Sequence, residues 1–186
     1  MGSLIRPLVR MTVTGVATAS LFAQPASAAR QSSVELAVKA TFLTKFTSYV
    51  DWPPRSLPAG APIIICVIGA DPFGSALEQA VSGQSSGGHP LILRRYDAAR
   101  DVDKCHIAYL GGSSRDISSA LASAASNPVV TVTDSRNANV NGMIHFQLVG
   151  NSVKFDIDTY KSSRAGLGIS SKLLGLARKV RRANTR

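Results

Sequence analysis

Two cysteines, Cys66 and Cys105, are the side chains best suited to covalent chemistry in this chain. A pair of thiols forms a disulfide in an oxidising compartment and stays reduced in the cytoplasm, so its chemistry depends on where the protein resides. Neither cysteine stands in a motif that would activate it as a nucleophile. The residues favour a disulfide that closes a loop of about forty residues, with two buried free thiols as the alternative.

The other side chains capable of chemistry are scattered along the sequence. His89, His106 and His145 are far apart, and none has a second ligand at metal-binding spacing. Asp71 and Asp134 each follow a predicted strand, where doubly wound folds place functional residues. No nucleophile or base accompanies them, however, and a carboxylate at such a position also forms turns. We therefore predict no catalytic residue, no metal site and no cofactor.

Two short segments have features of an anion site. Residues 69–74 form a glycine-containing turn, but they match neither the dinucleotide motif nor the P-loop, and Pro72 lacks the amide that would bind a phosphate. Ser170, Ser171 and Lys172 open the last predicted helix, where free amides and the lysine charge would attract an anion or a partner. Helix capping explains the two serines equally well.

The end of the chain is basic, with Arg178, Lys179, Arg181 and Arg182 close together. We expect either a solvated helix end, favoured by the helix dipole, or contact with anionic lipid headgroups. The formal net charge of +10 would suggest nucleic acid as a partner, but export and a single Trp disfavour this. An anionic membrane or an acidic protein face fits better.

The chain begins with the three parts of a secretory signal peptide, residues 1–28. Arg6 and Arg10 carry its only charges, a mostly apolar stretch follows, and a small-x-small cleavage site ends at Ala28. An N-terminal membrane anchor is the alternative. We predict a cut after Ala28, a periplasmic location, and a single domain over residues 29–186.

The elements that must position these residues alternate between strands and helices. A helix over 34–49, opened by a Ser-x-x-Glu capping box, presents Phe42 and Phe46 on an apolar face. We expect these two residues and Trp52 to be core rather than an exposed docking patch. The remaining predictions are strands at 63–69, 91–95, 106–110 and 129–133, a hairpin at 143–149 and 153–157, and helices at 75–81, 117–125 and 170–181. This order predicts a three-layer α/β sandwich with a mostly parallel sheet of about six strands, helices on both faces, and a C-terminal antiparallel hairpin.

Several of these segments resemble the YfiR-like periplasmic family. They are residues 38–46, 50–53, 65–74, 105–107, 130–134 and 166–177. The resemblance covers about residues 34–182 in the right order. It implies a compact α/β domain without catalytic activity that represses an inner-membrane diguanylate cyclase by binding its periplasmic domain. Repression would lower cyclic-di-GMP and biofilm formation, and an OmpA-like outer-membrane lipoprotein would sequester the repressor.

The resemblance also bears on the cysteines. Cys66 and Cys105 match the cysteine pair of the family, whereas residues 143–155 contain no cysteine where some members have a second pair. It therefore implies one disulfide here. A homodimer would match a dimeric cyclase. Two other hypotheses stay open: a small-ligand-binding module that reports to another receptor, such as a histidine kinase, and an exported hydrolase, which would need a nucleophile–base pair.

Overall fold

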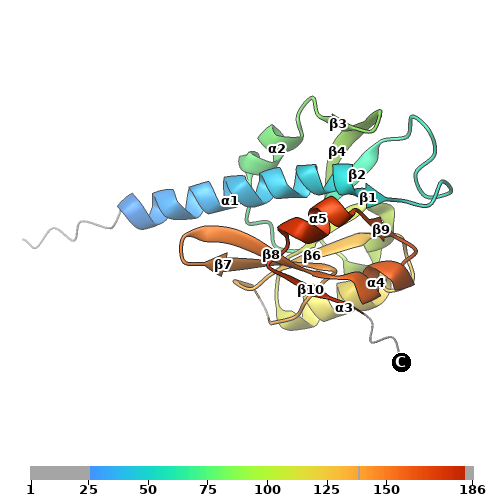
Figure 1. The fold of residues 1–186 in the computed structure, drawn as a ribbon. Helices are drawn as coiled ribbons and strands as arrows, with labels where there is room; N and C mark the ends of the chain where they lie inside the picture. The colour runs from blue at the N-terminus through green and yellow to red at the C-terminus, as the bar shows by residue number, and fades with distance from the viewer. Residues whose placement is uncertain (1–25, 138, 183–186) are drawn as a thin grey trace, which may run out of the picture.

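The predicted apolar runs form the strands of one sheet in a computed structural model that describes residues 26–137 and 139–182 (Figure 1). The sheet has eight strands in the order β10-β8-β7-β6-β5-β2-β4-β3. They are β2 (Ile63–Ile68), β3 (Ser85–Ser86), β4 (His89–Tyr96), β5 (Ile107–Leu110), β6 (Val130–Asp134), β7 (Ile144–Val149), β8 (Ser152–Asp158) and β10 (Lys179–Arg181). Most pairs are parallel, and β7 and β8 form the antiparallel hairpin that the sequence predicts.

Strand β2 shows why the sheet is covered on both faces. Successive side chains of a strand point to opposite faces. Ile63, Ile65 and Val67 accordingly pack into one apolar core, whereas Cys66 and Ile68 pack into a second core on the other face. All five are buried, which is typical of a strand inside a parallel sheet.

Helices form the outer layers (Figure 1). They are α1 (Ala26–Phe46), α2 (Ser75–Val81), α3 (Ser114–Ala124), α4 (Thr159–Arg164) and α5 (Ser171–Leu176). Helices α1, α2 and α5 lie on one face, α3 lies on the other, and α4 lies at the sheet edge beside β10. Short 3-10 turns, Thr47–Tyr49 and Ala99–Lys104, complete the connections. The predicted three-layer α/β sandwich is confirmed.

A separate two-stranded sheet links the end of α1 to the start of α5. Strand β1 (Val50–Asp51) pairs antiparallel with β9 (Gly168–Ile169), and the Ser170 amide donates to the Tyr49 carbonyl at 2.9 Å. These backbone bonds hold the two helices at a fixed separation.

The prediction of one helix over residues 170–181 is wrong beyond Leu176. Residues Lys179–Arg181 instead form β10, a parallel edge strand beside β8. The Arg178 amide donates to the Phe155 carbonyl at 2.8 Å, and the Arg178 guanidinium binds the Asp156 carboxylate through two nitrogens. These contacts with β8 outweigh local helix propensity, and β10 together with β3 raises the strand number from about six to eight.

The N-terminal helix also begins earlier than the capping box predicts. Helix α1 runs from Ala26, so Ser32 lies inside it rather than at its start. The predicted cut after Ala28 falls in the first turn of this helix, and residues 1–25 lie outside the described residues. Among residues 26–137 and 139–182, no helix has both the length and the apolar character needed to cross a membrane.

A disulfide joins Cys66 in β2 to Cys105, which directly precedes β5. Both residues are buried and pack with Val102 in the core beneath α3. The bond spans 39 positions of sequence and encloses α2, β3 and β4. It therefore joins two neighbouring strands in the middle of the sheet.

Removing this disulfide should lower the free energy of unfolding by about 4 kcal/mol, because a cross-link of this span restricts the unfolded chain. We expect a Cys66→Ala/Cys105→Ala variant and the reduced wild-type protein to show the same loss in urea titrations. A loss below about 1 kcal/mol in both would contradict this account.

Candidate functional site

The end of the sheet where β2 and β5 diverge is the usual ligand site of an open α/β fold. Strand β2 lies between β4 and β5 in the sheet: the chain leads from β2 to β4 on one side of β2, and later to β5 on its other side. Here the two following loops touch: a Cβ added to Gly111 would lie 1.9 Å from the Ala70 carbonyl oxygen. The opening beside them contains the carboxylates of Asp97 and Asp116. Close backbone contact and negative charge both disfavour a phosphate ligand.

The helix start near this opening is already capped. Ser113 Oγ accepts the Asp116 amide at 3.3 Å, and the Asp116 carboxylate accepts the hydroxyl and amide of Ser113 at 2.6 and 3.2 Å. These bonds lower the pKa of Asp116 and keep it ionised at the helix N-terminus. Asp71 likewise serves its own turn, accepting the Phe73 amide at 2.7 Å and pairing with Arg95.

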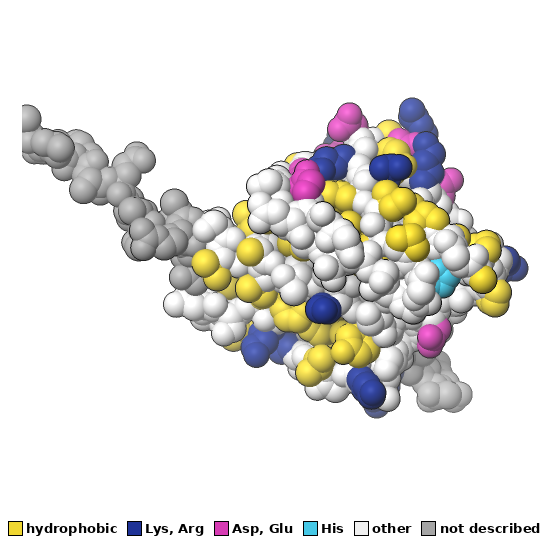
Figure 2. Space-filling model, turned by 90° about the horizontal axis from the view of Figure 1, so that it is seen from above, with side chains coloured by type: hydrophobic (Ala, Val, Ile, Leu, Met, Phe, Trp, Pro, Cys, Tyr) yellow, Lys and Arg dark blue, Asp and Glu magenta, His cyan; other side chains and the backbone are white. Residues whose placement is uncertain are grey.

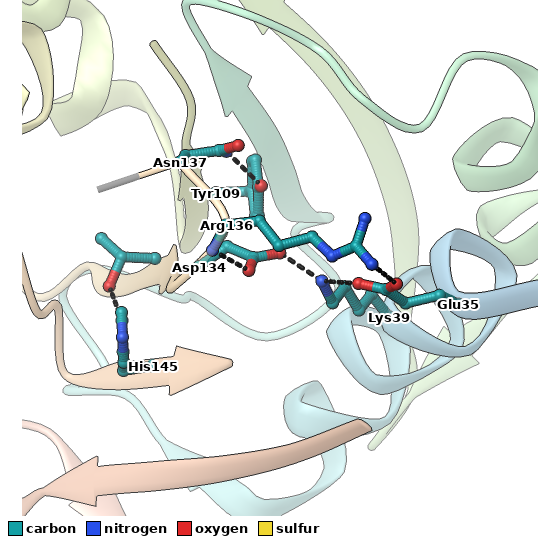
Figure 3. A network of polar contacts seen from close by, with 8 residues as sticks. Glu35, Lys39, Tyr109, Asp134, Arg136, Asn137 and His145 are labelled. Carbon is teal, nitrogen blue, oxygen red and sulfur yellow. Dashed lines mark hydrogen bonds and ion pairs between the residues drawn. The ribbon is translucent and has the colours of Figure 1, made fainter. Parts of the chain in front are cut away.

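A buried charge network lies at the same edge, between α1 and the end of β6 (Figure 3). Lys39 is 1% exposed and forms ion pairs with Glu35, one turn earlier on α1, and with Asp134. Arg136 completes the network, because its guanidinium contacts the second Glu35 oxygen at 2.9 Å. Two cations and two carboxylates thus alternate with no net charge, which is the arrangement that makes burial of charged groups tolerable.

The neighbouring polar groups are also held by protein partners. Asn137 donates to the Tyr109 hydroxyl at 2.8 Å, and burial raises the pKa of Tyr109, which keeps the phenol protonated. The Asp134 carboxylate also accepts the Arg136 amide at 2.9 Å. This network attaches α1 to the sheet, and it presents no nucleophile beside a free base.

The three histidines lie in separate places. His106 accepts the Ile64 amide at Nδ1, so its Nε2–H donates to the Ser56 carbonyl, both at 3.0 Å. His145 bonds the Thr133 hydroxyl at 2.7 Å. Burial lowers the pKa of both His106 and His145, and keeps these rings neutral. Within the described part of the chain, no three His, Cys, Asp or Glu side chains are placed to hold a metal ion.

An apolar groove with a volume of about 480 Å³ lies between α1 and α5. Its lining is almost wholly apolar or aromatic: Val34, Ala37, Val38, Thr41, Phe42, Lys45, Phe46, Tyr49, Phe155, Leu173 and Leu176. Leu176 is 64% exposed, Val34 57% and Val38 38%. Large apolar side chains gathered on one exposed surface indicate a binding site for another molecule.

The floor and the walls of the groove have different roles. Phe42, Phe46 and Phe155 form its floor, with ring centroids 5.2 to 5.9 Å apart; Phe42 stacks on Phe46, and both meet Phe155 edge to face. Val38 and Leu176 stand above this floor on facing helices. Rigid aromatic floors beneath exposed aliphatic walls are suited to accept an apolar anchor from a partner.

Positive charge surrounds the groove. Lys45 lines it, and no carboxylate does. Exposed Lys172 and Lys154 lie on α5 and β8, which both contribute residues to the lining of the groove. Figure 2 shows dark blue side chains beside the yellow ones over this part of the face, whereas the magenta ones gather mainly elsewhere. A partner with acidic residues around an apolar centre would complement this surface.

The core prediction for the aromatic residues holds in part. Phe46 is fully buried, whereas Phe42 and Trp52 are only partly buried against the core. Val34 and Val38, on the same helix, are exposed. The sequence pattern predicts an apolar helix face but does not show whether a neighbouring element covers it.

Ser170, one of the three residues predicted as an anion or partner contact, has a local structural role. Ser170 Oγ caps the six-residue α5 by accepting the Lys172 amide at 3.3 Å. Lys172 itself is exposed. The capping alternative therefore accounts for Ser170, and Lys172 belongs to the positive surroundings of the groove.

The basic C-terminal residues lie along the sheet edge rather than at a helix end. Arg178 pairs with Asp156, and Arg181 lies 3.6 Å from Asp158. Lys179, Arg181 and Arg182 are exposed. Their contact with anionic lipid headgroups stays a prediction.

One comparison with known proteins identifies relatives at the level of a family. The model of the family described as YfiR/HmsC-like matches residues 36–178, which include the disulfide, helix α5, the second half of α1, and Lys39, Asp134 and Arg136 of the charge network. No curated protein matches the chain. The resemblance drawn from the sequence motifs is confirmed.

Replacing Lys39 with Met should destabilise the fold by about 3 to 5 kcal/mol, because it leaves two buried carboxylates with one remaining cation. Lys45→Met provides the control on the same helix, since Lys45 is exposed and has no ion pair among the described residues. We expect that change to stay within about 0.5 kcal/mol in denaturant titrations. Equal stability of the two variants would show that the network does not anchor α1.

Proposed function

This chain belongs to the YfiR/HmsC-like family of periplasmic regulators in cyclic-di-GMP signalling, and we propose that it represses an inner-membrane diguanylate cyclase. Repression acts through the apolar groove between α1 and α5, which binds the periplasmic sensory domain of the cyclase. The outcome is a lower cyclic-di-GMP concentration and less biofilm. The role is that of a binding protein, in line with the non-catalytic character of the family.

The observation that supports this proposal is the exposed apolar lining of the groove. Exposed Val38 and Leu176 lie over a floor of packed Phe rings. Removing such apolar surface from water favours a complex, and aromatic pockets of this kind hold the residues that dominate binding energy. Lys45 and its neighbours then orient a partner whose rim is acidic.

Repression follows from preferential binding. A sensory domain that exists in active and inactive conformations is shifted toward whichever conformation binds the groove better. If the free energies of binding to the two conformations differ by about 1.4 kcal/mol, the ratio of the two conformations changes tenfold on binding. How completely the cyclase is switched off therefore depends on how much better the groove fits the inactive conformation.

Release of repression needs a competitor or a change in the groove. We propose that an OmpA-like outer-membrane lipoprotein sequesters the protein, as the family resemblance implies. A competitor that covers Leu176 would exclude the cyclase by steric overlap alone, so no conformational change is required.

Leu176→Asp should abolish repression, because it places an unpaired charge in the apolar interface. We expect affinity for the cyclase's periplasmic domain to fall at least thirtyfold, which corresponds to about 2 kcal/mol, and cellular cyclic-di-GMP to rise. Leu176 is exposed, so the fold should keep its stability.

The matched control is Val149→Asp, which changes another exposed apolar residue, at the tip of the β7–β8 hairpin and outside the groove. This variant should repress normally. If both variants repress equally well, the groove is not the binding surface; if neither represses, the effect is not specific to it.

A further inference from the structure

A second cavity, of about 250 Å³, opens beside α3, on the side of the sheet opposite to the groove. It lies between the end of α3, helix α4 and strand β10. Its lining residues are Leu121, Ala124, Ala125, Thr131, Met143, Asp158, Tyr160, Lys161, Arg164 and Arg181. Helix α3 covers only part of this face, so the strands nearer the edge are left with an open pocket.

Three cations converge on the cavity, and one carboxylate opposes them. Lys161, Arg164 and Arg181 line the cavity, with Asp158 as the single acidic residue. Asp158 uses one oxygen to accept the Lys161 amide at 3.1 Å and caps α4, while its other oxygen lies 3.6 Å from Arg181. One carboxylate therefore offsets only one of the three positive charges.

The other two cations have neutral neighbours. The Lys161 ammonium donates to the Asn141 carbonyl, and the Arg164 guanidinium lies 5.9 Å from the centroid of the Tyr160 ring. Neither forms an ion pair within residues 26–137 and 139–182. Burial lowers the pKa of Lys161 and nearby Arg181 lowers it further, whereas the charge of Asp158 partly opposes this shift. A half-buried ammonium that forms no direct ion pair favours the binding of an anion.

Most of the remaining lining is apolar. Leu121 and Ala124 come from α3, Ala125 directly follows it, and Met143 directly precedes β7. The cavity thus has a cationic side at α4 and β10 and an apolar side at α3. A phosphate ion would use only the first side, whereas an organic acid would use both. The volume is smaller than that of pockets for drug-sized molecules, which restricts the ligand to a small one.

We propose that this cavity binds a small organic carboxylate with an apolar body. The carboxylate lies between Lys161 and Arg164, and the apolar body packs against Leu121 and Met143. The inference stands apart from the proposed repressor function, because the cavity shares no residue with the groove.

The test uses the exported mature protein and isothermal titration with three probes: phenylacetate, phenylacetamide and inorganic phosphate. Phenylacetate should bind at one saturable site, and the amide, which lacks the charge, should bind at least tenfold more weakly. Phosphate should also bind at least tenfold more weakly, because it leaves the apolar side unfilled. Equal binding of phenylacetate and phosphate would overturn the proposal, as would the absence of saturable binding.

Variants then locate the site. Arg164→Gln changes an exposed side chain, so the protein should fold normally and bind phenylacetate at least tenfold more weakly. Arg115→Gln is the control, since Arg115 is an exposed arginine on α3 that does not line the cavity. Unchanged binding by Arg164→Gln, or the same loss in both variants, would overturn the assignment of this cavity.

Discussion

The burial of Lys39 between Glu35 and Asp134 determines how the rest of the molecule is arranged. A lysine this deeply buried is stable only beside carboxylates, so the rotation of α1 about its own axis is fixed by these ion pairs. With Lys39 facing the sheet edge, Val34 and Val38 face outward. The ion pairs of Lys39 on one side of α1 therefore leave the apolar side chains on another side exposed, and these side chains line the groove.

The other wall of the groove is placed by backbone pairing. Strands β1 and β9 join the end of α1 to the start of α5, so Leu176 stands at a defined distance from Val38. The C-terminal segment then links the two faces of the molecule. Its helix α5 lines the groove, whereas α4 and β10, which flank α5 in the sequence, line the cationic cavity. One continuous segment of chain thus contributes to both surfaces.

The sequence predicted the features that depend on local pattern. Buried strands such as β2 are continuous β-branched runs, the hairpin has a Gly-Asn turn, and export favoured pairing of the two cysteines. The family motifs were recognisable because many of these residues are core.

The sequence did not reveal the buried role of Lys39, since a lysine on a helix is usually solvated, and its carboxylate partner Asp134 is 95 positions away. Strand β10 was missed for a similar reason: its conformation is set by Arg178 and Asp156 across the sheet edge, not by its own residues. The groove was missed because periodicity shows which residues share a helix face and does not show whether a neighbour covers that face.

The central claim is that the groove between α1 and α5 is the surface that contacts a diguanylate cyclase. The most direct measurement places a photo-crosslinking amino acid at Val38 of the protein in living cells and identifies the captured membrane protein by mass spectrometry. The account predicts capture of a protein with a cytoplasmic diguanylate cyclase domain from Val38, and none from the same probe at Val149. Capture of the cyclase from Val149 but not from Val38 would contradict it.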